Sequence, residues 1–121
     1  MGDVNRELDI YGLACGKIRY NPEKKFPYKH YGTTSVRKHI LDRHRASTQF
    51  DDVSKFGTDS VRKIDKLIRE TIDAGVVNYV ENSVVKVFSR NIGTTSFGVP
   101  TNKIKVFFDS KGWVRTAFPI S

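Results

Sequence analysis

The spacing of apolar residues changes once along this chain, and that change constrains the fold more than any other feature. In residues 36–45 and again from about residue 58 to 74, on either side of a connector, apolar side chains recur every three or four positions, the period of an amphipathic helix. Beyond Gly75 they form β-branched and aromatic runs separated by glycine, proline and asparagine, which is typical of strands and turns. Helices followed by strands predict an α+β fold, with N-terminal helices packed on one face of a C-terminal antiparallel β-sheet.

Two helices are expected. The first covers residues 36–45, and residues 33–35 supply side chains that can cap its N-terminus. The second begins at Thr58 or Asp59 and ends before Gly75, which suits the left-handed position that follows a helix.

Two hairpins are expected after the helices. The first pairs residues 76–80 with 84–89, and the second pairs residues 103–109 with 113–118 through a turn that holds Gly112. The residues between the hairpins are expected to form a loop with room for one short strand.

The turn of the second hairpin predicts its register. With Asp109 opposite Trp113, Val106 faces Thr116, and His44 and Thr116 should point into the same contact region between helix and sheet. The face expected to meet the helices is apolar except for one threonine and holds Ile104, Val106, Phe108, Val114, Thr116 and Phe118.

The 121 residues fit a single globular domain, with a loop-rich N-terminal extension at residues 1–32 and a body at residues 33–121. In the extension, residues 20–31 alternate aromatic with basic side chains. Such a segment can bind single-stranded nucleic acid, or it can be a loop that its rings anchor to the core. Cys15 is the only cysteine, which excludes an internal disulfide and a cysteine-based zinc site.

The chain is strongly basic. It has 21 Lys and Arg against 13 Asp and Glu, a formal net charge of +8. A domain with this charge attracts polyanions, of which nucleic acid is the commonest, followed by acidic proteins and anionic membrane surfaces. No apolar run approaches the length of about 20 residues that spans a bilayer, so we expect no stable membrane anchoring.

The basic and imidazole side chains suggest a chemistry. Cleavage of RNA without a metal ion needs a base for the 2′-OH, an acid for the leaving 5′ oxygen, and cations for the phosphorane. His39, Arg43 and His44 lie on the first helix. The last strands add further candidates, which are Thr101, Lys103, Lys105, Arg115 and Thr116.

The two histidines are five positions apart, about 140° around an ideal helix. They can meet at one phosphate only if the helix ends or bends near Arg43, and otherwise one is catalytic and the other structural. Asp42, Asp51 and Asp52 match no ligand spacing with His39. We therefore expect no metal ion and no cofactor.

Several segments also resemble a known family. They are the helix at 39–44, the glycines at 93 and 98, and the segments 100–106 and 109–119. In this order they resemble the C-terminal toxin domains of bacterial contact-dependent growth inhibition and related polymorphic toxin systems. Those domains are grouped with the barnase–EndoU–colicin–RelE-like ribonucleases. The resemblance covers about residues 33–120.

The resemblance implies a toxic, metal-independent ribonuclease that cleaves tRNA and leaves a 2′,3′-cyclic phosphate. It would be delivered from the producing bacterium into the cytoplasm of a target cell and neutralised by a cognate, acidic immunity protein. The resemblance places catalytic roles on His39 and His44, with Arg43 beside them. Thr101, Lys105 and Thr116 would bind phosphate or complete the site.

The chain departs from the family at two of these positions. Lys105 stands where members often have arginine, which keeps the charge but loses the bidentate fork. Trp113 stands where they often have asparagine, which puts a ring near the basic face as a platform for a base. We expect Lys103, Arg115 and Trp113 to bind substrate.

Two other functions remain open at this point. The chain could be a non-catalytic nucleic-acid-binding module that uses the basic face of the last hairpin. It could also be a protein-interaction domain whose basic surface fits an acidic partner, and an immunity protein would satisfy both this reading and the ribonuclease reading.

Overall fold

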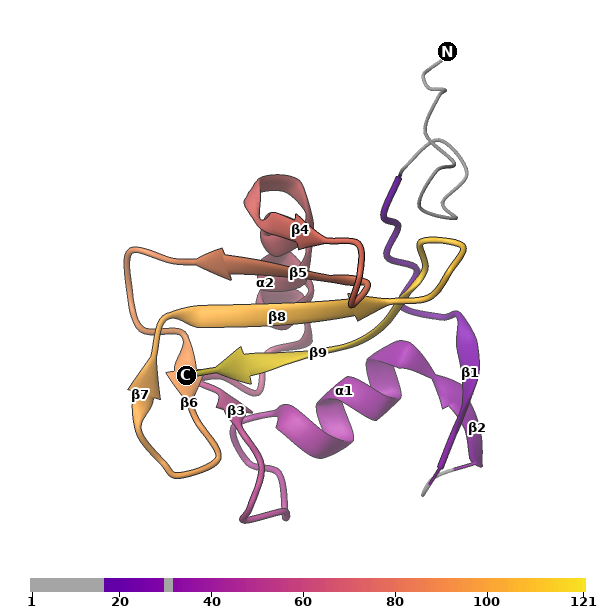
Figure 1. The fold of residues 1–121 in the computed structure, drawn as a ribbon. Helices are drawn as coiled ribbons and strands as arrows, with labels where there is room; N and C mark the ends of the chain where they lie inside the picture. Colours follow the sequence, from indigo (N-terminus) through magenta and orange to yellow (C-terminus); the bar gives the residue numbers. More distant parts are fainter. Residues whose placement is uncertain (1–16, 30–31) are drawn as a thin grey trace.

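The α+β class is confirmed by a computed structural model, which describes residues 17–29 and 32–121. Cys15, His30 and Tyr31 lie outside the described residues. The described part forms two helices and three antiparallel sheets (Figure 1). In chain order the elements are β1 (Lys25–Tyr28), β2 (Gly32–Ser35), α1 (Val36–His44), β3 (Lys55–Phe56), α2 (Val61–Ala74), β4 (Val76–Asn78), β5 (Ser83–Val87), β6 (Gly93–Thr94), β7 (Pro100–Thr101), β8 (Lys103–Phe108) and β9 (Val114–Ile120).

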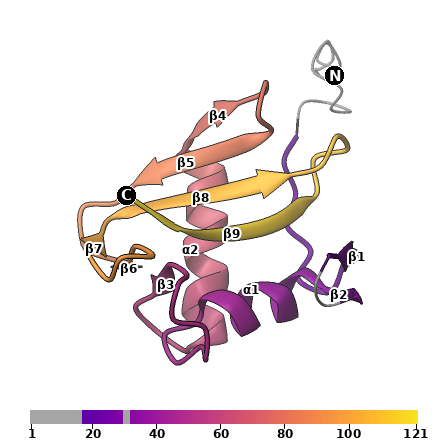
Figure 2. The same ribbon diagram turned by 60° about the horizontal axis from the view of Figure 1, so that its bottom comes forward.

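The largest sheet has the strand order β4-β5-β8-β9, and the two helices meet it in different ways. Helix α2 packs across the face formed by β5 and β8, where Ile64, Ile68, Val84, Ile104 and Val106 are fully buried. Helix α1 instead lies along β9, as both ribbon views show (Figures 1 and 2). The expected packing on one face of the sheet therefore holds for α2 and not for α1. The helices are also not the first elements of the described chain, because β1 and β2 precede α1.

Both helices begin at a serine cap. Ser35 accepts a hydrogen bond from the Lys38 amide, and Ser60 accepts one from the Lys63 amide, each 3.2 Å long. Helix α2 thus begins later than expected from Thr58 or Asp59. The carboxylate of Asp59 is already used, because it accepts a hydrogen bond from the Ser47 amide at 2.8 Å.

Gly75 ends α2, but the expected left-handed conformation is wrong. Its φ is −82°, and the chain runs on in extended form into β4. A Cβ atom at this position would lie 2.5 Å from the Thr71 carbonyl oxygen, 2.7 Å from Val84 Cγ2 and 2.8 Å from the Val85 carbonyl oxygen. Close packing of the helix end against β5 therefore explains the glycine.

We predict that Gly75→Ala lowers the free energy of unfolding by about 1–3 kcal/mol, because the added methyl group overpacks a buried contact with backbone atoms. Gly57→Ala is the matched control, since a Cβ there meets its nearest atom at an ordinary 3.4 Å. Urea unfolding followed by circular dichroism measures both. Equal stability of the two variants would contradict this explanation of Gly75.

The last hairpin contains a β-bulge that the expected register lacked. Gly112 has φ +88°, as its turn requires, and Phe108 pairs with Val114 as expected. Phe107, however, pairs with Thr116, so Arg115 is an extra residue in β9. The expected pairing of Val106 with Thr116 is therefore wrong.

The bulge changes which side chains of β9 face the core. One extra residue moves every following side chain to the other face of the strand. Ala117 and Pro119 are buried, whereas Thr116 and Phe118 are half-buried and lie on the side of Phe107. Thr116 therefore does not share the face that packs on α2.

The first hairpin and the loop after it are close to expectation. Strands β4 and β5 are shorter than the runs 76–80 and 84–89, and Asn82 takes the left-handed conformation with φ 60° in the turn between them. The loop that follows contains two strands of two residues each, β6 and β7, rather than one.

The described part of the N-terminal segment packs against the body. Tyr20 and Phe26 are buried in the main core. Strand β1, which precedes residue 32, pairs with β2, which begins at that residue. The Tyr20 hydroxyl donates a hydrogen bond to Asp65 at 2.7 Å, and Arg37 forms an ion pair with the same carboxylate at 2.6 Å. Residues 20 and 26 thus contribute to the same core as the residues that follow.

Neither helix of the described part combines the length and the apolar character that crossing a membrane demands.

Candidate active site

His39 is the residue around which predicted site residues gather. It lies in the middle of α1 and is half-buried. Its Nε2 atom is 3.2 Å from the Thr116 hydroxyl oxygen on β9. Its ring stacks on Tyr28 of β1, with the ring centres 3.9 Å apart and the planes 4° from parallel. Strands β1 and β9, which lie far apart in sequence, therefore both contact the imidazole on α1.

Arg115 brings a positive charge to the same place. Its guanidinium lies 4.9 Å from the centre of the Phe26 ring and 5.7 Å from that of Tyr28. The Tyr28 hydroxyl donates a 2.6 Å hydrogen bond to the Arg115 carbonyl oxygen, which ties β1 to the bulge. Because Arg115 is the bulged residue and precedes Thr116, one local irregularity positions both the cation and the hydroxyl.

The pKa of His39 is lowered to about 4, chiefly because burial disfavours the charged imidazole. The charges of His44 and Arg43 lower this pKa further, and Asp42 opposes them. The ring is therefore neutral at pH 7 and able to accept a proton. An anionic phosphate beside it would raise the pKa again, because an opposite charge favours the protonated form.

His44 has a different environment. It is 7% exposed, and its ring packs on Phe118 with the centres 5.0 Å apart. Its Nδ1 atom is 2.7 Å from the Ser54 carbonyl oxygen, which can only accept, so Nδ1 carries the hydrogen. Burial lowers the pKa of His44 to about 4. These contacts suit a side chain that anchors the end of α1.

The two imidazoles therefore do not converge on one group. Helix α1 is continuous from Val36 to His44, without the distortion that convergence would need. His39 contacts Thr116, and His44 contacts Phe118 two residues further along β9. Of the two arrangements that the spacing left open, the geometry favours one reactive histidine and one structural histidine.

Four other predicted residues have contacts of a different kind. Arg43 lies over the ring of Phe50 at 4.8 Å. Lys105 forms an ion pair with Glu81 at 2.7 Å. Thr101 is buried, and its hydroxyl donates a hydrogen bond to the Ile120 carbonyl oxygen. Lys103 begins β8, where it pairs with β5 and β9 at the end of the strand that is far from the bulge. Arg43, on the same helix as His39, lies close enough to it to lower its pKa. These contacts of Thr101, Lys103 and Lys105 are with residues other than His39.

Trp113 lies beside the turn of the last hairpin and contacts two cations. The Arg19 guanidinium is 4.2 Å from the centre of its ring, and the Lys24 ammonium is 5.0 Å away. The sequence alone indicates no individual role for either cation. The alternation of basic and aromatic residues at 20–31 includes Lys24 but not Arg19, and only the folded structure shows which rings hold which charges.

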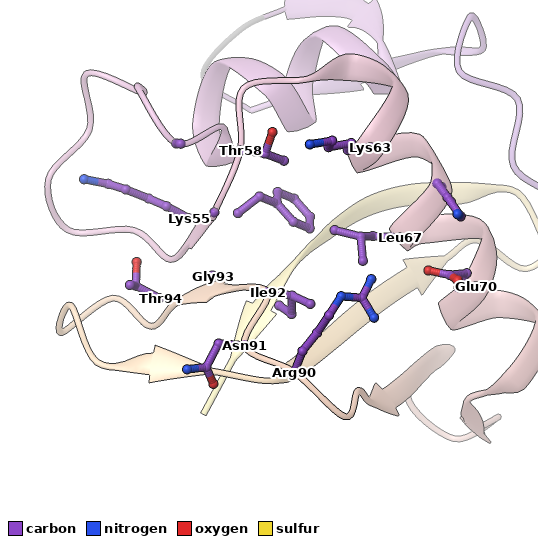
Figure 3. Close-up of a pocket in the computed structure, with 14 residues that line it drawn as sticks. Lys55, Thr58, Lys63, Leu67, Glu70, Arg90, Asn91, Ile92, Gly93 and Thr94 are labelled. Carbon is purple, nitrogen blue, oxygen red and sulfur yellow. The ribbon is translucent and has the colours of Figure 1, made fainter.

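A cavity of about 770 Å³ lies elsewhere, between α2, β3 and residues 90–94 (Figure 3). Lys63, Leu67 and Glu70 line it from α2, and Lys55 and Arg90 line it from the opposite side. No histidine and none of the predicted site residues lines this cavity. The cavity is therefore separate from the group of side chains around His39.

Within residues 17–29 and 32–121, no three side chains of the metal-binding types His, Cys, Asp and Glu gather into a group. Comparison of the chain with known protein families, curated proteins and solved structures gives no match. Function must therefore be inferred from the site itself and from the resemblance described above.

We predict that acid destabilises the protein through His44. The folded pKa of about 4 lies below the ordinary 6.5, so below pH 6.5 the unfolded chain binds a proton that the folded chain excludes. The stabilisation is complete above pH 6.5 and is lost as the pH falls towards 4. The difference of 2.5 pKa units sets the loss at about 3 kcal/mol.

Urea unfolding of the wild type and of His44→Asn at pH 7.0 and pH 4.5 tests this. Asparagine keeps a donor for the Ser54 carbonyl but does not titrate. The variant should lose less stability than the wild type on acidification, and an equal loss would show that His44 is not the group responsible. His39→Asn serves as the comparison, because His39 is the other histidine whose pKa is lowered.

Proposed function

We propose that the protein is a metal-independent endoribonuclease that cleaves RNA by attack of the 2′-OH, with His39 as the proton carrier. The observation that supports it most directly is the contact of a neutral imidazole with the Thr116 hydroxyl beside the Arg115 guanidinium. The net charge of +8 supports a polyanionic substrate. The resemblance to polymorphic toxin domains supports tRNA as that substrate.

The reaction can be derived from these side chains. The Nε2 atom of His39 accepts the proton of the 2′-OH, and the resulting alkoxide attacks the adjacent phosphorus. The Thr116 hydroxyl and the Arg115 guanidinium stabilise the charge of the phosphorane. The imidazolium then returns its proton to the leaving 5′ oxygen, which releases a 2′,3′-cyclic phosphate.

Tyr28 assists while the proton resides on His39. The imidazolium gains a cation–π interaction with the phenol ring on which it is stacked. Burial raises the pKa of the Tyr28 hydroxyl to about 12, so the phenol stays protonated and does not compete for the proton. His44 keeps α1 in place and takes no part in proton transfer.

The biological setting is proposed from the resemblance. The domain would be delivered by a producing bacterium and act in the cytoplasm of the target cell. A cognate acidic immunity protein would neutralise it, and the basic surface is suited to such a partner.

We predict that purified protein cleaves total tRNA in the presence of EDTA and that His39→Ala lowers the rate by about 10²- to 10⁴-fold, the usual contribution of a general acid–base group. Thr116→Val, which removes one hydroxyl, should slow cleavage less. Lys63→Ala on α2 is the control and should leave the rate unchanged. The products should end in a 2′,3′-cyclic phosphate.

His44→Asn completes this series. If the variant folds, it should retain most of the activity, because His44 only anchors α1. Undiminished cleavage by His39→Ala would overturn the assigned site, and cleavage that EDTA abolishes would overturn the metal-independent mechanism.

A non-catalytic RNA-binding module is the second candidate, and the cations held over Trp113 and Phe26 favour it. Such a module would bind RNA with steep salt dependence and no turnover.

We predict that expression of the domain in bacteria arrests growth and that expression of His39→Ala does not. A northern blot for tRNA shortly after induction should show fragments only with the wild type. Growth arrest by both proteins without tRNA fragments would favour binding over cleavage.

A further inference from the structure

A row of cations and aromatic rings leads from the turn of the last hairpin to His39. We name it the cation–ring track and define it by Arg19, Trp113, Lys24, Phe26, Arg115 and Tyr28. Each member contacts the next one in the row. The row is therefore continuous in space, although its residues come from two segments that are far apart in the sequence.

The contacts follow in order from the turn. The Arg19 guanidinium lies 4.2 Å from the centre of the Trp113 ring. The Lys24 ammonium lies 5.0 Å from Trp113 and 5.6 Å from Phe26. Arg115 lies 4.9 Å from Phe26 and 5.7 Å from Tyr28, which stacks on His39. The track therefore ends at the proposed site of cleavage.

The backbone keeps the track in one piece. Arg19 and Trp113 are joined by a β-bridge, and the Val114 amide donates to the Arg19 carbonyl at 2.9 Å. The Arg19 side chain also donates to the Lys111 carbonyl at 2.9 Å. Since the cations are held over rings and by hydrogen bonds, little side-chain entropy is lost when an anion binds them.

Among the described residues, no carboxylate forms an ion pair with Arg19, Lys24 or Arg115, the cations of the track. By contrast, Arg37, Lys38, Arg45 and Lys105 are each paired with an acidic side chain. Three held cations without an ion pair among the described residues form a site for three successive anionic groups.

We propose that the cation–ring track binds a single strand of RNA that continues from the scissile phosphate, with one phosphate at each of its three cations. This rests on the proposed function, which supplies the end of the track. Guanidinium planes fixed over aromatic rings also offer flat surfaces on which unpaired bases stack. A duplex would present its bases only to each other, so the substrate must be unpaired along the track.

Binding is tested with a fluorescent 2′-O-methyl RNA hexamer, which lacks the nucleophile and cannot be cleaved. Three phosphate contacts predict that the logarithm of the binding constant falls with the logarithm of salt concentration with a slope of about −2, or about −0.7 for each contact. Arg19→Ala, Lys24→Ala and Arg115→Ala should each reduce the slope by about 0.7. The matched controls Arg62→Ala and Lys63→Ala, on exposed positions of α2, should leave it unchanged.

Trp113 gives a second, independent measurement, because it is the only tryptophan in the chain. Its fluorescence should change when the hexamer binds, and the change should be lost in Arg19→Ala. The track is overturned if the fluorescence is indifferent to RNA, or if the three variants bind as the controls do. It is also overturned if a duplex of the same length, or an acidic peptide, binds equally tightly and with the same sensitivity to the variants.

Cleavage of two substrates separates the track from the proposed function. Arg19→Ala and Lys24→Ala should slow the cleavage of long unpaired RNA several-fold and leave cleavage of a dinucleotide unchanged. Lost binding in these variants without any cleavage by the wild type would reject the ribonuclease and keep the track. Cleavage that needs His39 but is indifferent to Arg19 and Lys24 would reject the track and keep the ribonuclease.

Discussion

The proposed active site depends on one extra residue in the last strand. Without the bulge at Arg115, Thr116 would alternate into the core that packs on α2, and no hydroxyl would face His39. With the bulge, the following alanine and proline fill that core instead. The same irregularity aims the Arg115 guanidinium at the rings of β1. A bulge beside a functional site is a recurrent use of this motif, because it redirects side chains without ending the pairing.

A partly buried polar network lies on the other side of α1 and joins it to the N-terminal segment. Asp65 of α2 accepts from Tyr20 and pairs with Arg37 of α1, so one carboxylate connects the N-terminal segment to both helices. The hydrogen bond to this carboxylate raises the pKa of Arg37. Burial, followed by the bond to Asp65, raises the pKa of the Tyr20 hydroxyl, which stays protonated. The network joins the segment before β1 to α1 and α2, and Tyr28 of β1 stacks on the His39 ring.

The sequence predicted the α+β class, both helices and the last turn, because the apolar period and the cap residues are local signals. It did not predict the bulge, since no residue type in β9 requires one. It likewise placed His39 and Thr116 in the site but not Tyr28, whose role depends on pairing between segments with no mutual sequence signal. The expected roles of Lys105 and Thr101 rest on their residue types and on the family resemblance. Their partners in the structure, Glu81 and the last strand, are set by tertiary contacts.

The electrostatics of the site connect its stability to its chemistry. Burial lowers the pKa of His39, and this lowers the stability of the protein only in acid. At neutral pH the imidazole stays unprotonated, with the cations Arg43 and Arg115 nearby. An RNA phosphate bound beside these cations would offset part of their positive charge and raise the pKa of His39. The imidazole would then hold the proton it removes from the 2′-OH for as long as the phosphorane is present, and release it once the charge has moved to the leaving oxygen. In the proposed mechanism one histidine would therefore serve as base and acid in turn, because the RNA itself would supply the charge that shifts its pKa.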